Sequence, residues 1–454
     1  MKWTSVLSSL VGATMLASGL AAADFDLHSP FQGVAFQRTT AFRSRAPDIE
    51  SSYRQVLKSF RGRTAGHNAA SAIGAAEKGQ PGAGYQNISA LGPYGTQYAV
   101  EVIWDGKSIP LIFDTGSADT WAASSDFSCV SAMGGTEYPQ EACRFGPHLI
   151  EDFRYGAIPD IHFRLSYGSG ERIAGPMGYS DIEVAGITVK QVQVGLANST
   201  HWYGNNVTQG ILGLAYPALT SAYSGSPSED RSAFSIPYPP FFTSMVQQGL
   251  VADSFSVALA RNSSEGIVAW GGRTGVPTTG PVTSTDLLIT RINTGVPESA
   301  WSYSYYTILV DGIQWGQTID SSKYPFVVDT GTTLTYMPPP IAEAIARAFN
   351  PPAMYLFSYG SYFVRCDAVA PRIAIIINGS KFWFNPVDLV YRHLRDELTD
   401  MCQIGVSTGG PGPYILGMTF LQNVEVMFDV GAAEIRFYGR NTFGPVPTLP
   451  DETQ

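Results

Sequence analysis

Charged side chains are scarce in this chain of 454 residues, since Asp, Glu, Lys and Arg together make up 15% of it. So few charges, beside 47 Gly and 30 Pro, argue against long surface helices and favour short strands joined by tight turns. A hydrophobic fraction of 44% supplies a large core and argues against a disordered chain. We therefore expect a mainly β protein of two or three domains.

Several motifs that define binding and hydrolytic classes are missing. The chain has no HExxH, no CxxC and no GxSxG, and its 6 His residues have no ligand-like spacing. Metal-dependent and serine hydrolysis therefore lack support, and we expect neither a metal nor a cofactor. The glycine-rich run at 409–412 is not placed between a strand and a helix as a phosphate-binding loop requires, so it predicts a turn.

Long hydrophobic runs are missing after the first 23 residues. Residues 1–23 have one basic residue, an apolar stretch and an Ala-Ala-Ala end, which predict a secretory signal peptide. A membrane anchor is the alternative, but Ser and Gly interrupt the run. Residues 441–454 lack the hydrophobic end of a lipid-anchor signal. We expect a secreted protein with no membrane anchor, and retention in a vacuole stays open.

Cysteine is also rare, with only 4 residues. In an exported chain they predict two disulfides with three possible pairings, of which local closure favours Cys129 with Cys143 and Cys366 with Cys402. Export also agrees with N-glycosylation sequons. These sequons begin at Asn87, Asn198, Asn206, Asn262 and Asn378.

The charges that are present are unevenly distributed. Residues 24–85 hold 8 basic and 5 acidic residues, whereas the rest of the chain after the signal holds 19 basic and 33 acidic ones. The acidic body makes nucleic acid an improbable partner. Residues 64–84 are rich in Ala and Gly, which indicates a flexible link. We expect 24–85 to be a removable basic leader that binds the body.

A long-range repeat divides the remainder. Residues 111–117, Leu-Ile-Phe-Asp-Thr-Gly-Ser, recur at 326–332 as Phe-Val-Val-Asp-Thr-Gly-Thr, and each copy is followed later by an Ile-Leu-Gly sequence, at 211–213 and 415–417. One Asp-Thr-Gly triplet is weak evidence, but two after apolar strands with matching echoes are strong. We expect two similar lobes, residues 86–274 and 275–454.

The repeated carboxyls suit acid–base chemistry on water. One carboxylate takes a proton from water while a second carboxyl, still protonated, polarises a carbonyl group. Two carboxyls that share a site titrate as a pair because like charges resist double ionisation. The candidates are Asp114 and Asp329, and the sequence does not assign the base to either of them.

From about Tyr94 to Gly439 the chain resembles the pepsin family of aspartic proteases, and Asp114 to Trp121 is most similar to the secreted fungal branch. The resemblance implies a bilobal fold, with two β-barrel-like lobes and the active-site cleft between them. It also implies roles for the two triplets. Thr115 and Thr330 would brace the two loops against each other, and the hydroxyls of Ser117 and Thr332 would hydrogen-bond the aspartates. Gly116 and Gly331 would permit the tight turns.

The same resemblance implies a flap over the cleft at residues 165–170. Tyr167 would cover the substrate, on a tip that includes Gly168 and Ser169, and Trp121 would hydrogen-bond this Tyr. Ile112 and Ile211 match positions that line the substrate pocket. Thr208 stands where an aromatic residue is common, and the long loop 122–166 has no predicted path.

The predicted function is hydrolysis of peptide bonds in proteins at acid pH, with hydrophobic residues preferred around the cut. The alternative is a pepsin-fold binding protein without catalysis, for which a damaged triplet would be expected. The leader would be an intramolecular inhibitor with a basic side chain, Lys58 being the candidate, near Asp114 and Asp329. We expect a monomer whose other partners are protein or peptide substrates.

Overall fold

The computed structural model describes residues 34–37, 46, 48–61, 96–132, 135–167, 170–226, 235–260, 265–292, 302–396, 398–410 and 414–440. Some predictions fall outside these ranges. They are the signal peptide, much of the leader, the sequons at Asn87 and Asn262, and the flap residues Gly168 and Ser169.

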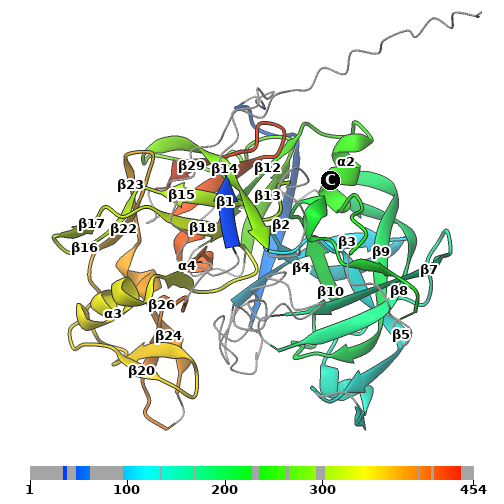
Figure 1. Cartoon of the computed structure of the whole chain (residues 1–454), viewed down its shortest axis with the longest axis horizontal. Coiled ribbons are helices and arrows are strands. Elements are labelled where there is room, and N and C mark those ends of the chain that lie inside the picture. Colours follow the sequence, from blue (N-terminus) through cyan, green and yellow to red (C-terminus); the bar gives the residue numbers. More distant parts are fainter. Residues whose placement is uncertain are drawn as a thin grey trace, which may run out of the picture.

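Figure 1 shows two lobes side by side with strands running between them. In the described residues, 21 strands hydrogen-bond into one continuous sheet system, and two further sheets of four strands belong to the C-terminal half. This mainly β, bilobal arrangement confirms the predicted fold class. The exact limits of the domains stay predictions.

Among its described residues, the N-terminal lobe contains one α-helix, one long hairpin and several shorter strands. The strands are β3 (Thr96–Trp104), β4 (Lys107–Asp114), β5 (Trp121–Val130), β6 (Glu137–Tyr138), β7 (Ala157–Ser166), β8 (Arg172–Val184), β9 (Ile187–His201), β10 (Gly210–Gly213) and β11 (Ala222–Ser224). The helices are the α-helix α2 (Phe241–Gln247) and two 3-10 turns, η1 (Gln140–Cys143) and η2 (Pro217–Leu219).

The C-terminal lobe repeats this design with shorter strands. They are β15 (Thr307–Val310), β16 (Gly312–Trp315), β17 (Thr318–Asp320), β18 (Tyr324–Val328), β19 (Thr335–Met337), β20 (Met354–Leu356), β21 (Ser361–Val364), β22 (Ile373–Ile377), β23 (Ser380–Trp383), β24 (Val390–Arg395), β25 (Cys402–Ile404), β26 (Val406–Thr408) and β27 (Tyr414–Leu416). Its helices are α3 (Pro339–Arg347), α4 (Met418–Leu421) and the 3-10 turn η4 (Pro386–Leu389).

A central group of strands joins the lobes. It comprises β1 (Val34–Gln37), β2 (Tyr53–Arg61), β12 (Ser254–Leu259), β13 (Glu265–Trp270), β14 (Val282–Ile292), β28 (Val424–Asp429) and β29 (Glu434–Gly439). β12 pairs with β28, and β28 and β14 flank β29. In the core beneath, Phe255 stacks on Phe428 with ring centroids 4.7 Å apart. Chain segments far apart in sequence thus form one platform for both lobes.

Part of the predicted leader belongs to this platform. β2 pairs antiparallel with β13 on one side and with β3 on the other, and Leu57 on β2 is fully buried. Lys58, the candidate for the place beside the two aspartates, is exposed and lies in register with Glu265 and Ala99. Its pairing with the aspartates stays a prediction.

Short turns close several hairpins as their residues require. Two-residue turns with positive φ at both positions match the right-handed twist of the flanking strands, and they favour Asn or Asp followed by Gly. Three hairpins have this geometry, at Asp105-Gly106, Ala185-Gly186 and Asn378-Gly379. Asp-Gly and Asn-Gly are dipeptides that predict such a turn from sequence, whereas Ala-Gly does not.

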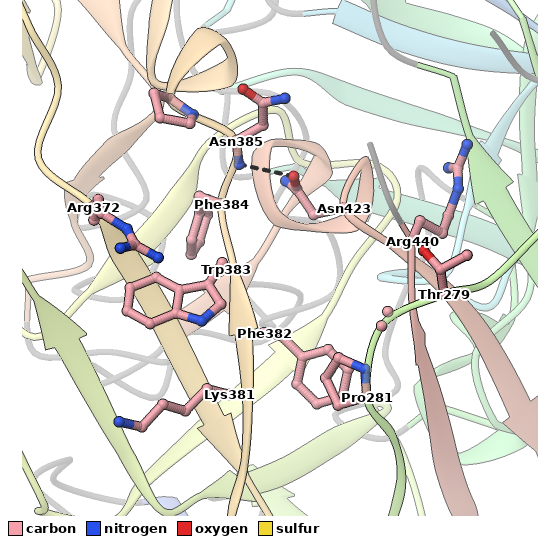
Figure 2. Close-up of a pocket in the computed structure, with 13 residues that line it drawn as sticks. Thr279, Pro281, Arg372, Lys381, Phe382, Trp383, Phe384, Asn385, Asn423 and Arg440 are labelled. Atoms are coloured by element: carbon pink, nitrogen blue, oxygen red, sulfur yellow. Dashed lines mark hydrogen bonds between the residues drawn. The ribbon is translucent and has the colours of Figure 1, made fainter. Parts of the chain in front are cut away.

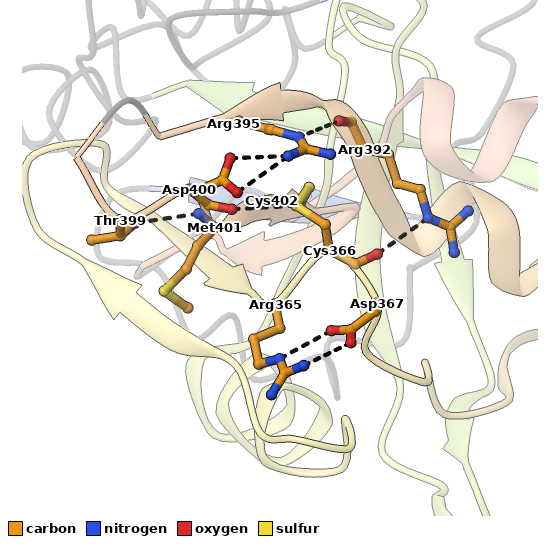
Figure 3. Close-up of a disulfide and its surroundings, with 9 residues drawn as sticks. All are labelled: Arg365, Cys366, Asp367, Arg392, Arg395, Thr399, Asp400, Met401 and Cys402. Atoms are coloured by element: carbon orange, nitrogen blue, oxygen red, sulfur yellow. Dashed lines mark hydrogen bonds and ion pairs between the residues drawn. A yellow bond between two sulfur atoms is a disulfide. The ribbon is translucent and has the colours of Figure 1, made fainter.

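Both predicted disulfides are present, each within one lobe. Cys129 bonds Cys143 with Cα atoms 5.8 Å apart, and Cys366 bonds Cys402 with Cα atoms 5.0 Å apart. Figure 3 shows the second bond beside an ion pair of Arg395 with Asp400. The loop before β22 is thereby held to β25.

The remaining predictions concern the surface and the membrane. Asn198, Asn206 and Asn378 are exposed, which leaves their sequons accessible. Their glycosylation stays a prediction. Among the described residues, no helix has both the length and the apolar character needed to cross a bilayer.

Candidate active site

Two parallel strand pairs place the aspartates. Asp114 is the last residue of β4, which runs parallel to β10 with Asp114 in register with Gly213. Asp329 directly follows β18, which runs parallel to β27, and its amide donates to the carbonyl of Leu416 at 3.2 Å. The two Ile-Leu-Gly echoes in the sequence are therefore the strands that flank the two aspartates.

Reciprocal hydrogen bonds tie the two triplets together across the lobes. The amide of Thr115 donates to Oγ1 of Thr330, and the amide of Thr330 donates to Oγ1 of Thr115, both at 3.0 Å. Each hydroxyl also donates to a strand carbonyl of the other lobe, at Val328 and Phe113, both at 3.0 Å. All these groups are buried, so the bonds fix one loop against the other.

Each aspartate accepts a matching pair of hydrogen bonds from its own loop. Gly116 N donates to Oδ1 of Asp114 at 2.8 Å, and the hydroxyl of Ser117 donates to Oδ2 at 2.5 Å. In the other lobe, Gly331 N donates to Oδ1 of Asp329 at 2.7 Å and Thr332 Oγ1 donates to Oδ2 at 2.6 Å. Asp114 and Asp329 are each 1% exposed.

The glycines of the triplets permit the carboxyls to lie close together. A methyl group at Gly116 would lie 2.6 Å from Cγ of Asp329, and one at Gly331 would lie 2.5 Å from Oδ1 of Asp114. Distances this short are not tolerated between non-bonded atoms. Each loop therefore presents bare backbone to the other lobe's aspartate.

Burial and proximity change the titration of this pair. Desolvation raises the pKa of Asp329 well above its ordinary value, and the nearby charge of Asp114 raises it further. Hydrogen bonds from Thr332 and Gly331 oppose this rise. The pair thus retains a proton at a pH at which isolated aspartates are both ionised.

Tyr167 lies at the end of β7, in the hairpin that β7 forms with β8. Its hydroxyl accepts a hydrogen bond from Nε1 of Trp121 at 2.6 Å, and its ring is 4% exposed. Desolvation first, and the charge of Asp119 next, raise the pKa of Tyr167 well above its ordinary range, so it stays neutral. Trp121 and Tyr167 are therefore brought together as predicted.

The predicted pocket residues also come together. Ile112 on β4 is in register with Ile211 on β10, and both are buried in one apolar cluster with Trp121 and Tyr167. Thr208, at a position where an aromatic residue is common in the family, is buried and donates its hydroxyl to Asn205 Oδ1 at 3.2 Å.

The sequence reading missed two aromatic residues of this cluster. Trp202 packs edge-on against Trp121, with ring centroids 5.1 Å apart, and Phe145 lies parallel to Trp202 at 5.9 Å. Phe145 belongs to the loop whose path was open, and the amide of Gly146 donates to the Thr208 carbonyl at 3.1 Å. The loop thus supplies an aromatic ring beside the position where Thr208 has none.

A buried carboxyl next to the site was also missed. Asp119 is 2% exposed, and its Oδ1 accepts hydrogen bonds from the Tyr238 hydroxyl at 2.7 Å and the Ser221 amide at 2.9 Å. Its Oδ2 has no hydrogen-bond partner among the described residues. Desolvation is the main cause that raises the pKa of Asp119 from 3.8 to about 6, against these hydrogen bonds.

We expect Asp119→Asn to raise stability at neutral pH and to change little at pH 4. A raised folded-state pKa means that stability is complete below 3.8 and is lost as pH rises through about 6. The neutral amide avoids that loss, which is roughly 3 kcal/mol. Urea unfolding from pH 4 to 7.5, in an Asp329→Asn background that prevents self-digestion, measures it. A stability difference that does not change with pH would contradict the raised pKa.

We expect Tyr167→Phe to cost about 1–3 kcal/mol of unfolding free energy, because the buried Trp121 Nε1–H loses its acceptor. Trp121→Phe removes the donor, so Tyr167→Phe should cost less in that background than in the parent. Urea unfolding of both single variants and the double variant, each with Asp329→Asn, gives the coupling energy. Additive single effects would show that this hydrogen bond contributes nothing.

Among the described residues, no group of three or more His, Cys, Asp or Glu side chains is arranged to hold a metal ion. The site geometry instead consists of two buried carboxyls on equivalent loops. Residues 97–438 match the model of the eukaryotic aspartyl protease family. The chain belongs to this family. It is an aspartic endopeptidase.

Individual relatives agree with this assignment. A probable aspartic-type endopeptidase of Aspergillus fumigatus is 35% identical over 354 residues, which cover 76% of this chain and 78% of the relative. Rhizopuspepsin of Rhizopus chinensis is 27% identical over 336 residues, 73% of this chain and 75% of the relative. The crystal structure of an aspartic proteinase from Irpex lacteus matches with a TM-score of 0.56 at 20% sequence identity. The match covers 77% of this chain and 96% of that one, and it supports the fold.

Proposed function

We propose that Asp114 and Asp329 hydrolyse peptide bonds by activating a water molecule between them, at acid pH. The observation that supports this most is the symmetry of the pair. Equivalent donors hold each carboxyl, and the raised pKa of Asp329 keeps a proton on the pair. One carboxylate and one carboxylic acid are the two states that the reaction needs.

In the first step the ionised carboxyl takes a proton from water, and the water oxygen bonds to the peptide carbonyl carbon. The protonated carboxyl gives its proton to the carbonyl oxygen, which yields a tetrahedral diol. In the second step the carboxyl that took the proton from water gives it to the peptide nitrogen, and the other carboxylate takes a proton from a hydroxyl of the diol. The carbon–nitrogen bond breaks, which releases a carboxyl and an amine product. The pair ends with the one proton with which it began.

The proposed substrate preference is for hydrophobic side chains around the cut. Ile112, Ile211, Tyr167 and the neighbouring Trp202 form one apolar cluster next to Asp114. Burial of an apolar side chain there gains about 25 cal/mol for each Å² removed from water. In this proposal Gly168 and Ser169 continue the flap beyond Tyr167.

Acid proteolysis tests the proposal against a binding protein of the same fold. We expect the acid-treated protein to cut denatured haemoglobin at pH 3–4, where Asp and Glu titrate, with new ends next to hydrophobic residues. Pepstatin, a peptide that mimics the tetrahedral state, should block it. Tight pepstatin binding without any cleavage would identify a non-catalytic binding protein.

We also propose that residues 1–23 direct secretion and that 24–85 inhibit the protease until acid releases them. The leader is basic and the body acidic, so carboxylate protonation weakens their attraction. Release must also break the pairing of β2 with β3 and β13. The secreted protein would be a monomer that carries N-linked glycans.

The purified precursor should be inert near pH 7 and should lose roughly 60 residues when shifted to about pH 3–4. N-terminal sequencing locates the cut, which we expect between residues 74 and 87. An Asp114→Asn precursor should stay intact until active enzyme is added. Full activity at neutral pH with residues 24–85 attached would contradict an inhibitory leader, without affecting the proposal for the aspartates.

A further inference from the structure

A pocket lies in the C-terminal half, and none of the residues that line it belongs to the candidate active site. Its volume is about 540 Å³, within the range of ligand-binding pockets. Its walls are residues 279–281 before β14, β23 with the residues after it, and the end of β29 with Gly439 and the following Arg440. Figure 2 shows these side chains around the opening.

The charge of this pocket is opposite to that of the body. Arg372, Lys381 and Arg440 line it, and none of its described lining residues is acidic. Arg440 donates to the carbonyl of Leu259, whereas Arg372 and Lys381 are exposed. Neither of the two exposed residues forms an ion pair within the described ranges. A cluster of positive charge in a concave surface attracts anionic groups.

The pocket also presents a fixed aromatic surface. Cζ of Arg372 lies 4.4 Å from the ring centroid of Trp383, and Figure 2 shows this guanidinium beside the indole. Trp383 is partly exposed, whereas its neighbours Phe382 and Phe384 are buried against Phe437 and Phe420. The backbone of β23 is therefore anchored in the core. Rigid aromatic surfaces of this kind bind extended proline-containing segments.

The chain itself has a segment of matching chemistry beside this pocket. Residues 441–454, NTFGPVPTLPDETQ, follow pocket residue Arg440 directly. They contain three prolines, one phenylalanine, two acidic residues and no Lys or Arg. From Arg440 to Asp451 the segment can reach about 36–40 Å when extended, which is ample for folding back into the pocket.

We infer that residues 441–454 bind back into this pocket. Asp451 and Glu452 pair with Arg372 and Lys381, and the proline-containing part lies on Trp383. Attachment at Arg440 supplies an effective concentration in the millimolar range, so even weak contacts keep the pocket occupied. Because β23 belongs to a four-stranded sheet separate from that of β29, the segment straps two sheets of the lobe together.

The test uses two forms of the Asp329→Asn precursor, one intact and one ending at Arg440, and a fluorescent peptide of residues 441–454. We expect the shortened form to bind the peptide in a 1:1 ratio, more weakly as salt rises. The intact form should bind at least about ten-fold more weakly, because its own segment occupies the pocket. Circular dichroism confirms that both forms are folded.

Charge reversal identifies the contact. Arg372→Glu with Lys381→Glu, in the shortened form, should abolish binding of the native peptide. A peptide with Asp451→Lys and Glu452→Lys should bind this variant and not its parent, and a scrambled peptide should bind neither. Equal binding of the native peptide by the intact and shortened forms, or binding that survives the reversal, would overturn the inference. So would no binding at about 1 mM peptide, the concentration that a short tether supplies.

Discussion

Asp329→Asn is expected to lower kcat by about 10²–10⁴-fold while the protein stays folded, and Asp114→Asn is expected to do the same. The amide keeps the size of the carboxyl, its oxygen can still accept the bond from the Gly331 amide, and its NH2 group can donate to the hydroxyl oxygen of Thr332. It neither gains nor loses a proton, so the pair no longer holds one acid and one base. In Asp114→Asn, loss of the neighbouring charge also removes the repulsion that raises the pKa of Asp329.

Cleavage of a short peptide at pH 4 and thermal unfolding, measured on the same preparations, check this result. Each precursor is first processed with immobilised parent enzyme, which is then removed. Asp286→Asn is the matched control, because Asp286 is an exposed carboxyl of the C-terminal half and its loss should leave activity unchanged. Activity of Asp329→Asn within about ten-fold of the control would contradict the proposed mechanism.

Gly116→Ala is expected to lower kcat/KM by about 100-fold, although it adds a single methyl group. That methyl would lie 2.6 Å from both Cγ and Oδ1 of Asp329. The other lobe must move or the carboxyl must rotate, and the reciprocal bonds of Thr115 and Thr330 hold the loops against such movement. The carboxyls of Asp114 and Asp329 would then no longer be positioned to share a proton.

Gly106→Ala separates this clash from ordinary backbone strain. Gly106 has a φ of +90° in an exposed turn, and an added methyl would have no atom within 4 Å. This control should lose some stability, as a strained residue does, and keep its activity. Peptide hydrolysis and thermal unfolding of both variants give the comparison. Full activity of Gly116→Ala would show that the loops are less constrained than their hydrogen bonds indicate.

The repeated Asp-Thr-Gly triplets and their Ile-Leu-Gly echoes could be predicted to form equivalent sites because the information is local. An apolar strand followed by Asp-Thr-Gly sets where the strand ends and how the loop turns, and the echo is the strand beside it. The separation of the cysteines likewise favoured the pairings that the structure contains. Short-range patterns of this kind need no knowledge of the tertiary fold.

The missed residues depend on contacts between distant parts of the chain. Asp119 hydrogen-bonds Tyr238, and Phe145 packs on Trp202, across loops that have no regular period. Asp119 lies five residues after Asp114, in a polar stretch that reads as a surface turn. Its burial is set by residues about a hundred positions later, which a single sequence does not reveal.

The leader shows the same limit in another form. Its basic composition was visible, but the pattern of Tyr53–Arg61 gave no reason to expect two strand partners. One partner, β3, follows β2 only after the long Ala- and Gly-rich link. The other partner, β13, lies much later in the sequence, after the rest of the N-terminal lobe. Sheet partners of this kind are decided by the assembled platform.

The pH dependence of kcat/KM for the processed enzyme on a short peptide without ionisable side chains tests the shared proton most directly. The account predicts a bell-shaped profile with its maximum on the acid side. Activity falls at low pH as the second carboxyl is protonated, and falls as pH rises through the upper apparent pKa of the pair, because the last proton leaves. Activity that increases steadily up to neutral pH would contradict the account.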